Sequence, residues 1–334
     1  MDKTILLAHG SGGKLSRDLI AGVIFPALAN PLLAKMDDSA IFDIRGRVAY
    51  TTDSFVVSPI FFPGGDIGKL SVCGTVNDLA VVGARPLYLS LALIIEEGLP
   101  LTELERVMTS IREAAEEADV QIVTGDTKVV NHGSADKLFI TTSGIGIIPE
   151  GVDVSGANAR PGDRIILSGP IGDHGVAVMA QRENLRFKVP VESDCAPLNG
   201  LVAEILKYSE AVHSMRDPTR GGLATTLNEI AAQSKVSLRI YEEKIPVRPA
   251  VAAACEMLGL DPLYVANEGK LVAIVTPESA DFIVNSMRSQ RYGTESVIIG
   301  EVLTGHPGRV SMKTRLGASR LVDMLSGELL PRIC

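Results

Sequence analysis

The chain reads Thr51-Thr52-Asp53-Ser54 where a strand predicted over residues 47–52 ends, and Asn77-Asp78-Leu79-Ala80 within a helix predicted over residues 68–82. The helix is predicted because apolar side chains recur with a helical period, at Leu70, Cys73, Val76 and Ala80. Asp53 and Asp78 lie among small and hydroxyl-bearing side chains rather than in a solvated face rich in Lys and Glu. This setting makes both carboxylates candidates for a binding role.

Length and composition predict two domains. A chain of 334 residues is too long for one ordinary core. Hydrophobic residues make up 46% of it and aromatic residues only 4%, which suits close helix–sheet packing in an α/β or α+β protein. The segment from Pro149 to Gly162 is rich in Gly, Pro, Asp and Ser and has no periodicity, so it is the predicted boundary. We expect an N-terminal domain over residues 1–150, a C-terminal domain over 160–313 and a tail over 314–334.

The predicted elements follow the spacing of the apolar residues. In the N-terminal half we expect a helix over residues 16–28 and another that begins in the capping box Thr102-Glu103-Leu104-Glu105. The strands of that half are expected at 3–8, 40–44, 47–52, 87–95, 120–124 and 138–147. In the C-terminal half the strands are expected at 163–168, 236–241, 270–276 and 296–303, and the helices at 174–182, 197–207, 222–234, 248–258 and 278–289. The end of the chain, residues 329–334, is expected to be an exposed tail.

Charge and cysteine content exclude several classes of function. The net charge is −8 and no basic stripe with interleaved aromatic residues occurs, so nucleic-acid binding is not expected. The N-terminus is unlike a signal peptide, and no stretch reaches the length of a membrane span. No pair of cysteines has metal-binding spacing, which indicates a cytoplasmic protein with reduced thiols. Cys73 and Cys255 lie in apolar helical patterns and are expected in the core.

A set of acidic residues could hold Mg²⁺ against a polyphosphate, because hard oxygen ligands suit that ion. The set consists of Asp37-Asp38, Asp53, Asp78, and Asp126 in Thr124-Gly125-Asp126-Thr127. A single Asp of this kind more often caps a helix or a turn. Since all of them lie in one domain with a Gly-rich loop, the set as a whole favours metal–phosphate binding.

Two glycine-containing loops could approach an anion. The first is His9-Gly10-Ser11-Gly12-Gly13-Lys14, whose backbone N–H groups and Lys14 could bind a phosphate, although it does not match the Walker A pattern. The second is Asp217-Pro218-Thr219-Arg220-Gly221-Gly222, which opens a predicted helix where a phosphate could bind. For each loop a purely structural turn is an equally good interpretation.

Three further residues could take part in catalysis. Glu268, in Asn267-Glu268-Gly269-Lys270, and Lys128, just after Asp126, could each act as a general base or a charge clamp, although surface turns commonly carry such residues. Cys334 is the last residue, where a core role is least expected. A thiolate is a strong nucleophile and a carrier of acyl-type groups, yet a terminal Cys is by itself more often incidental.

Taken in order, these motifs closely resemble those of the hydrogenase-maturation carbamoyl dehydratases, the HypE family. That family lies within the superfamily of aminoimidazole-ribonucleotide (AIR) synthetase, thiamine-monophosphate kinase and selenophosphate synthetase. The resemblance covers essentially the whole chain, and the terminal motif separates this family from its relatives. Its most specific stretches are residues 51–59, 64–68, 76–80, 123–128 and 217–222 and the terminal Pro331-Arg332-Ile333-Cys334.

The resemblance implies a two-domain α+β fold of the AIR-synthetase (PurM) type. In this fold the N-terminal domain forms a dimeric β-barrel in a homodimer, and the C-terminal domain is α/β. It implies ATP and Mg²⁺ as cofactors, with Cys334, Glu268 and Lys128 as catalytic residues. The implied phosphate-binding residues are Gly10, Gly12, Gly13, Lys14, Thr52, Asn77, Thr127, Arg220, Gly221 and Gly222. The implied Mg²⁺ ligands are Asp38, Asp53, Asp78, Asp126 and Asp217.

The resemblance also implies a sequence of events. A carbamoyltransferase, HypF, loads a carbamoyl group onto Cys334, and ATP is then used to dehydrate this group to a thiocyanate. The cyanide passes to iron on a HypC–HypD complex, for the active site of nickel–iron hydrogenase. Neither nucleic acid nor membrane takes part.

Three alternatives are weaker. Selenophosphate synthetases use a reactive Cys or selenocysteine in the Gly-rich loop, where this chain has Ser11. Thiamine-monophosphate kinases have no need of a terminal Cys. A non-enzymatic carrier of the cyano group would have no need of Asp53, Asp78 and Asp126.

Overall fold

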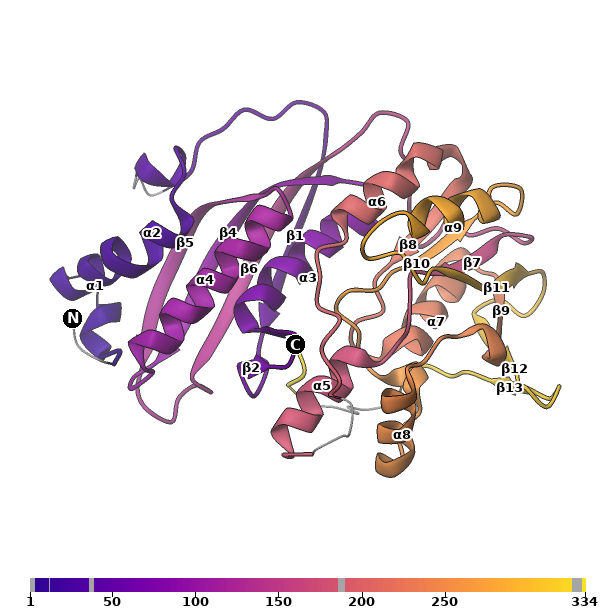
Figure 1. Cartoon of the computed structure of the whole chain (residues 1–334). Helices are drawn as coiled ribbons and strands as arrows, with labels where there is room; N and C mark the ends of the chain where they lie inside the picture. Colours follow the sequence, from indigo (N-terminus) through magenta and orange to yellow (C-terminus); the bar gives the residue numbers. More distant parts are fainter. Residues whose placement is uncertain (1–3, 12, 36–38, 186–189, 326–331) are drawn as a thin grey trace.

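The computed structural model describes residues 4–11, 13–35, 39–185, 190–325 and 332–334. Within them the first half is built on a four-stranded sheet in the order β1-β6-β4-β5. Its strands are β1 (Arg47–Phe55), β6 (Leu138–Ile148), β4 (Arg85–Glu96) and β5 (Gln121–Val130), of which only β4 and β5 pair in parallel. Helices α3 (Ile67–Val81) and α4 (Leu101–Glu117) lie against one face of this sheet (Figure 1). A short hairpin, β2 (Phe61–Phe62) and β3 (Gly65–Asp66), precedes α3.

The first residues of the chain form short helical segments at the β5 edge of this sheet. They are η1 (Leu7–Gly10), α1 (Lys14–Leu19), the π-helical turn η2 (Ile20–Ile24), α2 (Phe25–Leu28) and η3 (Leu33–Lys35). The helix predicted over 16–28 is therefore confirmed. The strand predicted over 3–8 is wrong, because the described part of it makes only an isolated bridge, between Thr4 and Pro100, and then turns into η1. The strand predicted over 40–44 does not form either.

The predicted capping box at Thr102 is also wrong. Helix α4 begins at Leu101, and its N-cap residue Pro100 makes no side-chain hydrogen bond to the first turn. By contrast, α3 has a genuine side-chain cap, since the Asp66 carboxylate accepts from the backbone N–H groups of Gly68 and Lys69 at 2.8 and 3.0 Å. That cap fixes the start of the helix that carries Asp78.

The second half is built on a seven-stranded sheet in the order β13-β12-β9-β11-β7-β10-β8. Its strands are β7 (Arg164–Leu167), β8 (Val212–Arg216), β9 (Ser237–Tyr241), β10 (Val272–Val275), β11 (Val297–Leu303), β12 (Arg309–Lys313) and β13 (Ser319–Leu321). The sequence patterns missed β8, β12 and β13. Because β13 pairs with β12, the sheet extends beyond residue 313, where the tail was expected to begin.

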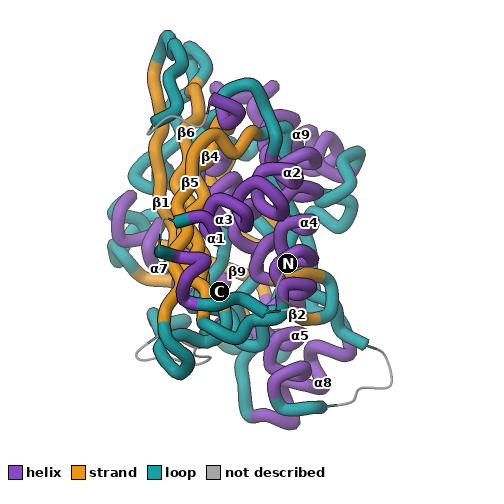
Figure 2. Tube along the Cα trace, turned by 90° about the vertical axis from the view of Figure 1, so that its left-hand side faces the viewer, coloured by secondary structure: helices purple, strands orange, loops and turns teal. Residues whose placement is uncertain are grey.

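Helices pack on both faces of the seven-stranded sheet, which lies behind the four-stranded sheet in the view of Figure 2. They are α5 (Asp173–Arg182), α6 (Asn199–Ile205), α7 (Gly222–Ser234), α8 (Pro249–Leu258) and α9 (Ala280–Arg288). Alternate strand residues explain the layers: Ile165 and Leu167 pack in one cluster with α7, whereas Ile166 packs in another with α6 and α9. Within the described residues, no helix is both long and apolar enough to cross a bilayer.

The two halves share buried contacts, in which Asn77 of α3 is central. Its amide Nδ2 donates to the carbonyls of Ala196 and Glu268 at 3.1 and 3.4 Å, and its Oδ1 accepts from the Leu198 N–H at 2.7 Å. Asn77 is almost fully buried. Its polar atoms therefore hold α3 against the loop that carries Glu268. The resemblance implied that Asn77 binds a phosphate, but in this structure its side-chain amide is already used between the two halves.

Replacing Asn77 by Leu should lower the free energy of unfolding by about 2 kcal/mol or more, because the Leu198 N–H and two carbonyls lose a buried partner. Denaturant unfolding measures this change. Asn285→Leu, at an exposed position of α9, is the matched control and should change stability little. Equal stability of the Asn77→Leu and Asn285→Leu proteins would contradict this role.

Candidate functional site

A small cavity of about 40 Å³ collects residues from distant parts of the chain. Asp53, Ser54 and Phe55 come from the end of β1, and Gly74 and Asp78 come from α3. Asp217, Thr219 and Arg220 come from the loop that precedes α7, Glu268 from the loop before β10, and Cys334 from the C-terminus. Figure 1 shows the C-terminus between the two halves of the molecule, close to β2. The structure therefore brings together six of the predicted site residues: Asp53, Asp78, Asp217, Arg220, Glu268 and Cys334.

The end of the chain is docked rather than exposed. Ile333 is 3% exposed and belongs to the core of the first half, against which Cys334 also packs. Only the part of the predicted tail before residue 326 and its last three residues are described, and of these Arg332 alone is exposed near the terminus. The prediction of an exposed tail is wrong for Ile333 and Cys334, because Ile333 occupies an apolar site that sequence alone does not reveal, whereas residues 329–331 of the predicted tail lie outside the described residues.

The thiol of Cys334 lies against the carboxyl group of Glu268. Burial and then the Glu268 carboxyl group raise the pKa of the Cys334 thiol, and burial and then the nearby Cys195 and Asp217 raise the pKa of Glu268 well above its usual value. Glu268 is 3% exposed, and its Oε1 has no hydrogen-bond partner among the described residues. A buried carboxyl group with a free oxygen beside a thiol is suited to exchanging protons with whatever the sulfur carries.

Three carboxylates crowd the mouth of this cavity. Burial and then the nearby Asp78 raise the pKa of Asp53 to about 6, while burial and then Asp78 raise that of Asp217 to about 7. Arg220 is the cation that opposes this effect at Asp53. Asp78 also accepts a 2.9 Å hydrogen bond from the Thr51 hydroxyl, which fixes its orientation. The site thus concentrates negative charge that a bound cation would offset.

These oxygens fit the chemistry of Mg²⁺ but do not form a complete site. Within the described residues, no three His, Cys, Asp or Glu side chains are close enough together to hold a metal ion. A cation between Asp53 and Asp78 would need additional oxygen ligands from a bound phosphate and from water, as Mg²⁺ commonly has. Asp38 lies outside the described residues.

The glycine pair Gly221-Gly222 has a structural reason. Both residues have positive φ angles, of 78° and 61°, and a side chain on Gly222 would overlap the backbone carbonyls of Leu263 and Val265. This tight turn starts α7 and places Arg220 at the cavity. The pair therefore positions Arg220 whether or not its N–H groups bind phosphate.

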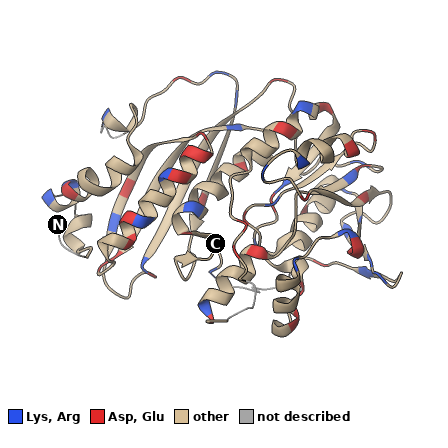
Figure 3. Cartoon of the chain, viewed as in Figure 1, with Lys and Arg blue, Asp and Glu red and all other residues tan. Residues whose placement is uncertain are grey.

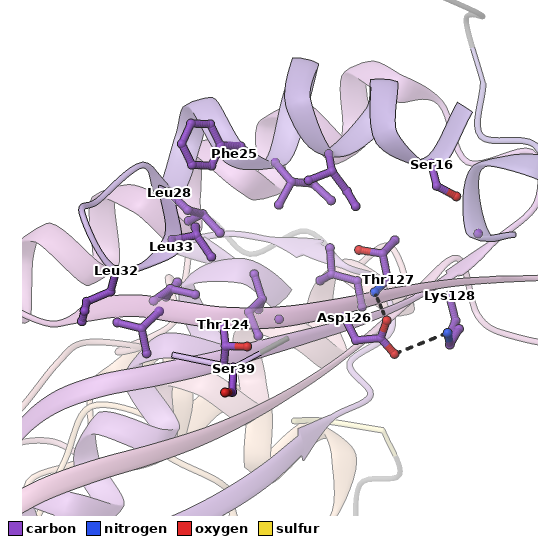
Figure 4. Close-up of a pocket in the computed structure, with 18 of the residues that line it drawn as sticks. Ser16, Phe25, Leu28, Leu32, Leu33, Ser39, Thr124, Asp126, Thr127 and Lys128 are labelled. Atoms are coloured by element: carbon purple, nitrogen blue, oxygen red, sulfur yellow. Dashed lines mark hydrogen bonds and ion pairs between the residues drawn. The ribbon is translucent and has the colours of Figure 1, made fainter. Parts of the chain in front are cut away.

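A second cavity, of about 290 Å³, holds another part of the predicted set (Figure 4). Gly10, Asp126, Thr127 and Lys128 line its polar side, and apolar side chains of the N-terminal helices, such as Phe25 and Leu28, line the other. Asp126 accepts from the Thr127 N–H at 2.8 Å and lies 3.6 Å from the Lys128 ammonium group. No residue lines both this cavity and the one at Cys334.

The four-stranded sheet separates Asp126 from Asp53. In register, Asp53 aligns with Thr142 and Leu91 on the face covered by α3, whereas Asp126 aligns with Ala92 on the opposite face. The strands that carry them, β1 and β5, are three inter-strand spacings apart, so their backbones are separated by about 14 Å. The predicted grouping of Asp126 and Lys128 with Asp53, Asp78 and Glu268 is therefore not formed within one chain.

The remaining predicted residues lie elsewhere. Gly13 and Lys14 begin α1 and line neither cavity, and Gly12 lies outside the described residues. Thr52 points to the same sheet face as Asp126, and its hydroxyl donates to the Thr142 carbonyl. Sequence reasoning missed Gly74. A Cβ atom at this position would lie 2.9 Å from the Phe55 ring, so the close packing of α3 on β1 requires glycine. An isolated glycine inside an apolar helix was the signal available.

Comparison with known proteins agrees with this geometry. The family described as AIR synthase related protein, N-terminal domain, matches residues 36–148, and its C-terminal domain counterpart matches residues 160–313. Fold and site thus define an AIR synthase related protein. The carbamoyl dehydratase HypE of Bradyrhizobium diazoefficiens is 54% identical over 330 residues, which cover 98% of this chain and 95% of that protein.

Two crystal structures are equally informative. Hydrogenase maturation protein HypE in complex with ATP is 49% identical with a TM-score of 0.96, and the match covers 99% of this chain and 100% of that one. A chain of the HypE–HypF complex is 51% identical with a TM-score of 0.82, and the match covers 92% of this chain and 99% of that one. This chain belongs to the HypE family of carbamoyl dehydratases, which are enzymes of hydrogenase maturation.

The raised pKa of Asp217 predicts a stability effect. The folded protein holds this proton up to about pH 7, whereas the unfolded chain releases it near its ordinary pKa of 3.8, so folding stability falls as pH rises between these values. Asp217→Asn removes the cost of ionisation and should raise the melting temperature by a few degrees at about pH 8, but not at about pH 4. Thermal unfolding of both proteins, with the exposed Glu278→Gln as control, measures this difference. A lower melting temperature of Asp217→Asn at the higher pH would contradict it.

Proposed function

We propose that this chain uses ATP to dehydrate a carbamoyl group carried on Cys334 to a thiocyanate. The observation that carries the proposal is the contact of the Cys334 thiol with the buried Glu268 in a cavity bordered by Asp53, Asp78 and Asp217. The relatives named carbamoyl dehydratase HypE and the ATP complex of one HypE support it. The carbamoyltransferase HypF and an iron-bearing HypC–HypD complex are the proposed donor and acceptor, and the HypE–HypF crystal structure supports the first.

The chemistry needs two protons removed and one oxygen activated. A carbamoyl oxygen is a poor leaving group, so its phosphorylation by ATP, with loss of the first N–H proton, yields ADP and the O-phosphorylated thiocarbonimidate R–S–C(=NH)–O–phosphate. Loss of phosphate and of the remaining N–H proton then forms the C≡N bond, and the carbamoyl oxygen leaves with the phosphate. Glu268 is the group placed to take a proton, because its free Oε1 lies in the cavity with the sulfur. A pKa raised by burial makes its carboxylate a stronger base once it is ionised.

The terminal phosphate of ATP is proposed to bind at the mouth of the cavity. A space of about 40 Å³ is too small for a nucleotide, but an adjoining cavity of about 330 Å³ shares Asp78 and Asp217 with it. Mg²⁺ bound between Asp53 and Asp78, with Asp217 beside them, would offset the phosphate charge, and Arg220 and Arg216 would be the neighbouring cations. Elsewhere in the described elements, Lys and Arg are intermixed with Asp and Glu along the ribbon (Figure 3).

We also propose that a second copy of the chain covers the open face of the four-stranded sheet. Tyr50, Ile145 and Tyr88 form one row across this face, next to Val48. Tyr50 is 68% exposed and Val48 is 48% exposed, so the edge strand β1 presents large apolar side chains to solvent on this face. The same face carries Asp126, which lies far from Cys334 within one chain. A homodimer would therefore bury Asp126 at the interface between the two copies. ATP bound near this face would explain why Asp126 and Lys128 lie apart from the other predicted site residues.

The homodimer predicts that Tyr50→Asp is monomeric, because a charge on the covered face would be buried without a partner. Analytical ultracentrifugation gives the mass of the variant in solution. Phe282→Asp, on α9, is the control, since Phe282 is also 68% exposed, and it should leave the dimer intact. A monomeric wild-type protein, or a dimeric Tyr50→Asp variant, argues against this interface.

The dehydration predicts different losses for two substitutions at the cavity. Cys334→Ala has no nucleophile at this position, so it should accept no carbamoyl group there and make no thiocyanate. Glu268→Gln keeps the shape of the side chain and should still be loaded, but it should dehydrate about a hundredfold more slowly or worse. Because the Glu268 carboxylate is the active form, the wild-type rate should rise with pH through its raised pKa, and Glu268→Gln should lack this rise.

Intact-protein mass spectrometry after loading by HypF and addition of Mg·ATP follows both steps. Lys128→Ala is the comparison for the alternative base. Normal dehydration by Glu268→Gln together with failure of Lys128→Ala would transfer the role of base to Lys128. Thiocyanate on Cys73, Cys195 or Cys255 would refute the proposed function.

A further inference from the structure

Helix α5 holds the end of the chain by its backbone at two successive carbonyls. Arg182, in the last turn of the helix, donates from Nη2 to the Arg332 carbonyl at 2.7 Å, which also accepts from the Ser58 N–H at 3.2 Å. His174, in the first turn, bonds through Nε2 to the Ile333 carbonyl at 2.8 Å. The Ile333 carbonyl belongs to the last peptide bond of the chain, directly next to Cys334.

The hydrogen bonds of His174 determine where its proton lies. A carbonyl can only accept, so Nε2 must carry the proton, and Nδ1 then accepts from the Ser193 hydroxyl at 2.8 Å. Ser193 Oγ in turn accepts from the Cys195 N–H at 3.1 Å. The side chain of His174 has no exposed surface, and burial lowers its pKa, which keeps the ring neutral. The ring therefore presents one fixed N–H donor to the tail.

Further hydrogen bonds connect the helix that carries His174, and the segment after Ser193, to the loop that carries Glu268. The Gly172 N–H, at the start of α5, donates to Asn267 Oδ1 at 2.7 Å, and the Gly175 N–H donates to the Ala266 carbonyl at 3.1 Å. On the other side, Asp194 follows Ser193 and accepts from the Glu268 N–H at 3.1 Å. The residue that holds the tail and the residue that meets the sulfur thus belong to one connected, buried unit.

We propose that His174 is a positioning residue of the dehydration: it docks the tail through the Ile333 carbonyl and thereby sets the substituent of the Cys334 sulfur against Glu268. The contact is made to the backbone, so it is the same whether the sulfur carries a proton, a carbamoyl group or a cyano group. Departure of the tail toward another protein leaves the N–H of His174 without a partner in an apolar site, which favours return. The inference rests on the proposed function for its kinetic part, whereas docking itself can be measured without catalysis.

Two substitutions separate the donor from the bulk of the ring. His174→Phe keeps a planar ring beside Phe62, which packs edge-on against His174, but it has no donor. His174→Gln restores an N–H at a similar distance along the side chain. Alkylation of unmodified protein by iodoacetamide reports on docking, because Cys73, Cys195 and Cys255 are buried and Cys334 is the thiol that undocking exposes. Alkylation of Cys334 should be about tenfold faster in His174→Phe and close to wild type in His174→Gln, as loss of one buried hydrogen bond allows.

Single-turnover dehydration of protein already carbamoylated on Cys334 should show the matching pattern. We expect the rate to fall about tenfold in His174→Phe and to recover in His174→Gln, while loading by HypF is unchanged or faster. A structural role alone would lower the melting temperature without changing alkylation of Cys334 relative to the other cysteines. Unchanged alkylation in His174→Phe, or equal slowing of loading and dehydration, would overturn the inference. Absence of dehydration in the wild-type protein would instead refute the proposed function, and alkylation would still decide whether His174 docks the tail.

Discussion

The site depends on a single contact, that of the last residue of the chain with Glu268. A C-terminal residue is normally among the most mobile parts of a protein. In this chain Ile333 is buried in the core and Cys334 completes the wall of a cavity whose other sides come from both halves. Without the docked tail, Glu268 would face an open space, and Asp53, Asp78 and Asp217 would border solvent rather than a sulfur. The cavity at Glu268 is therefore complete only when the C-terminal tail of the same chain is docked in it.

Charge is the second constraint. The protein carries a net charge of −8, and its site gathers several carboxyl groups near Arg220 and Arg216. Such a site repels a phosphate group unless cations accompany it. Burial and then repulsion by Asp78 raise the pKa values of Asp53 and Asp217. A divalent cation would turn the same repulsion into attraction for the phosphate, so the arrangement is costly when empty and favourable when a metal–nucleotide complex is bound.

Much of the fold and part of the site could be predicted from the sequence. The apolar residues around Asp78 correctly predicted α3, although this helix is buried on almost all sides rather than on one face. The separation of Asp53 from Asp126 could not be predicted, since it depends on strand order and on which face each residue occupies. Asn77 looked like part of a phosphate motif, yet its amide is used between the halves. Burial of Ile333 and the role of His174 depend on contacts with α5. This helix was predicted, but it lies far from the tail in sequence, and nothing in its residue pattern indicates that it binds the tail.

The fate of the carbamoyl oxygen decides whether this cavity performs the proposed chemistry. Protein loaded on Cys334 with a carbamoyl group that contains heavy oxygen is given Mg·ATP, and the released phosphate is analysed by mass spectrometry. Phosphorylation of the carbamoyl oxygen followed by elimination predicts that the heavy oxygen appears in the inorganic phosphate, in equal amount to the thiocyanate formed on Cys334. Thiocyanate formed with unlabelled phosphate, with the heavy oxygen released as water, would contradict the phosphorylation of the carbamoyl oxygen.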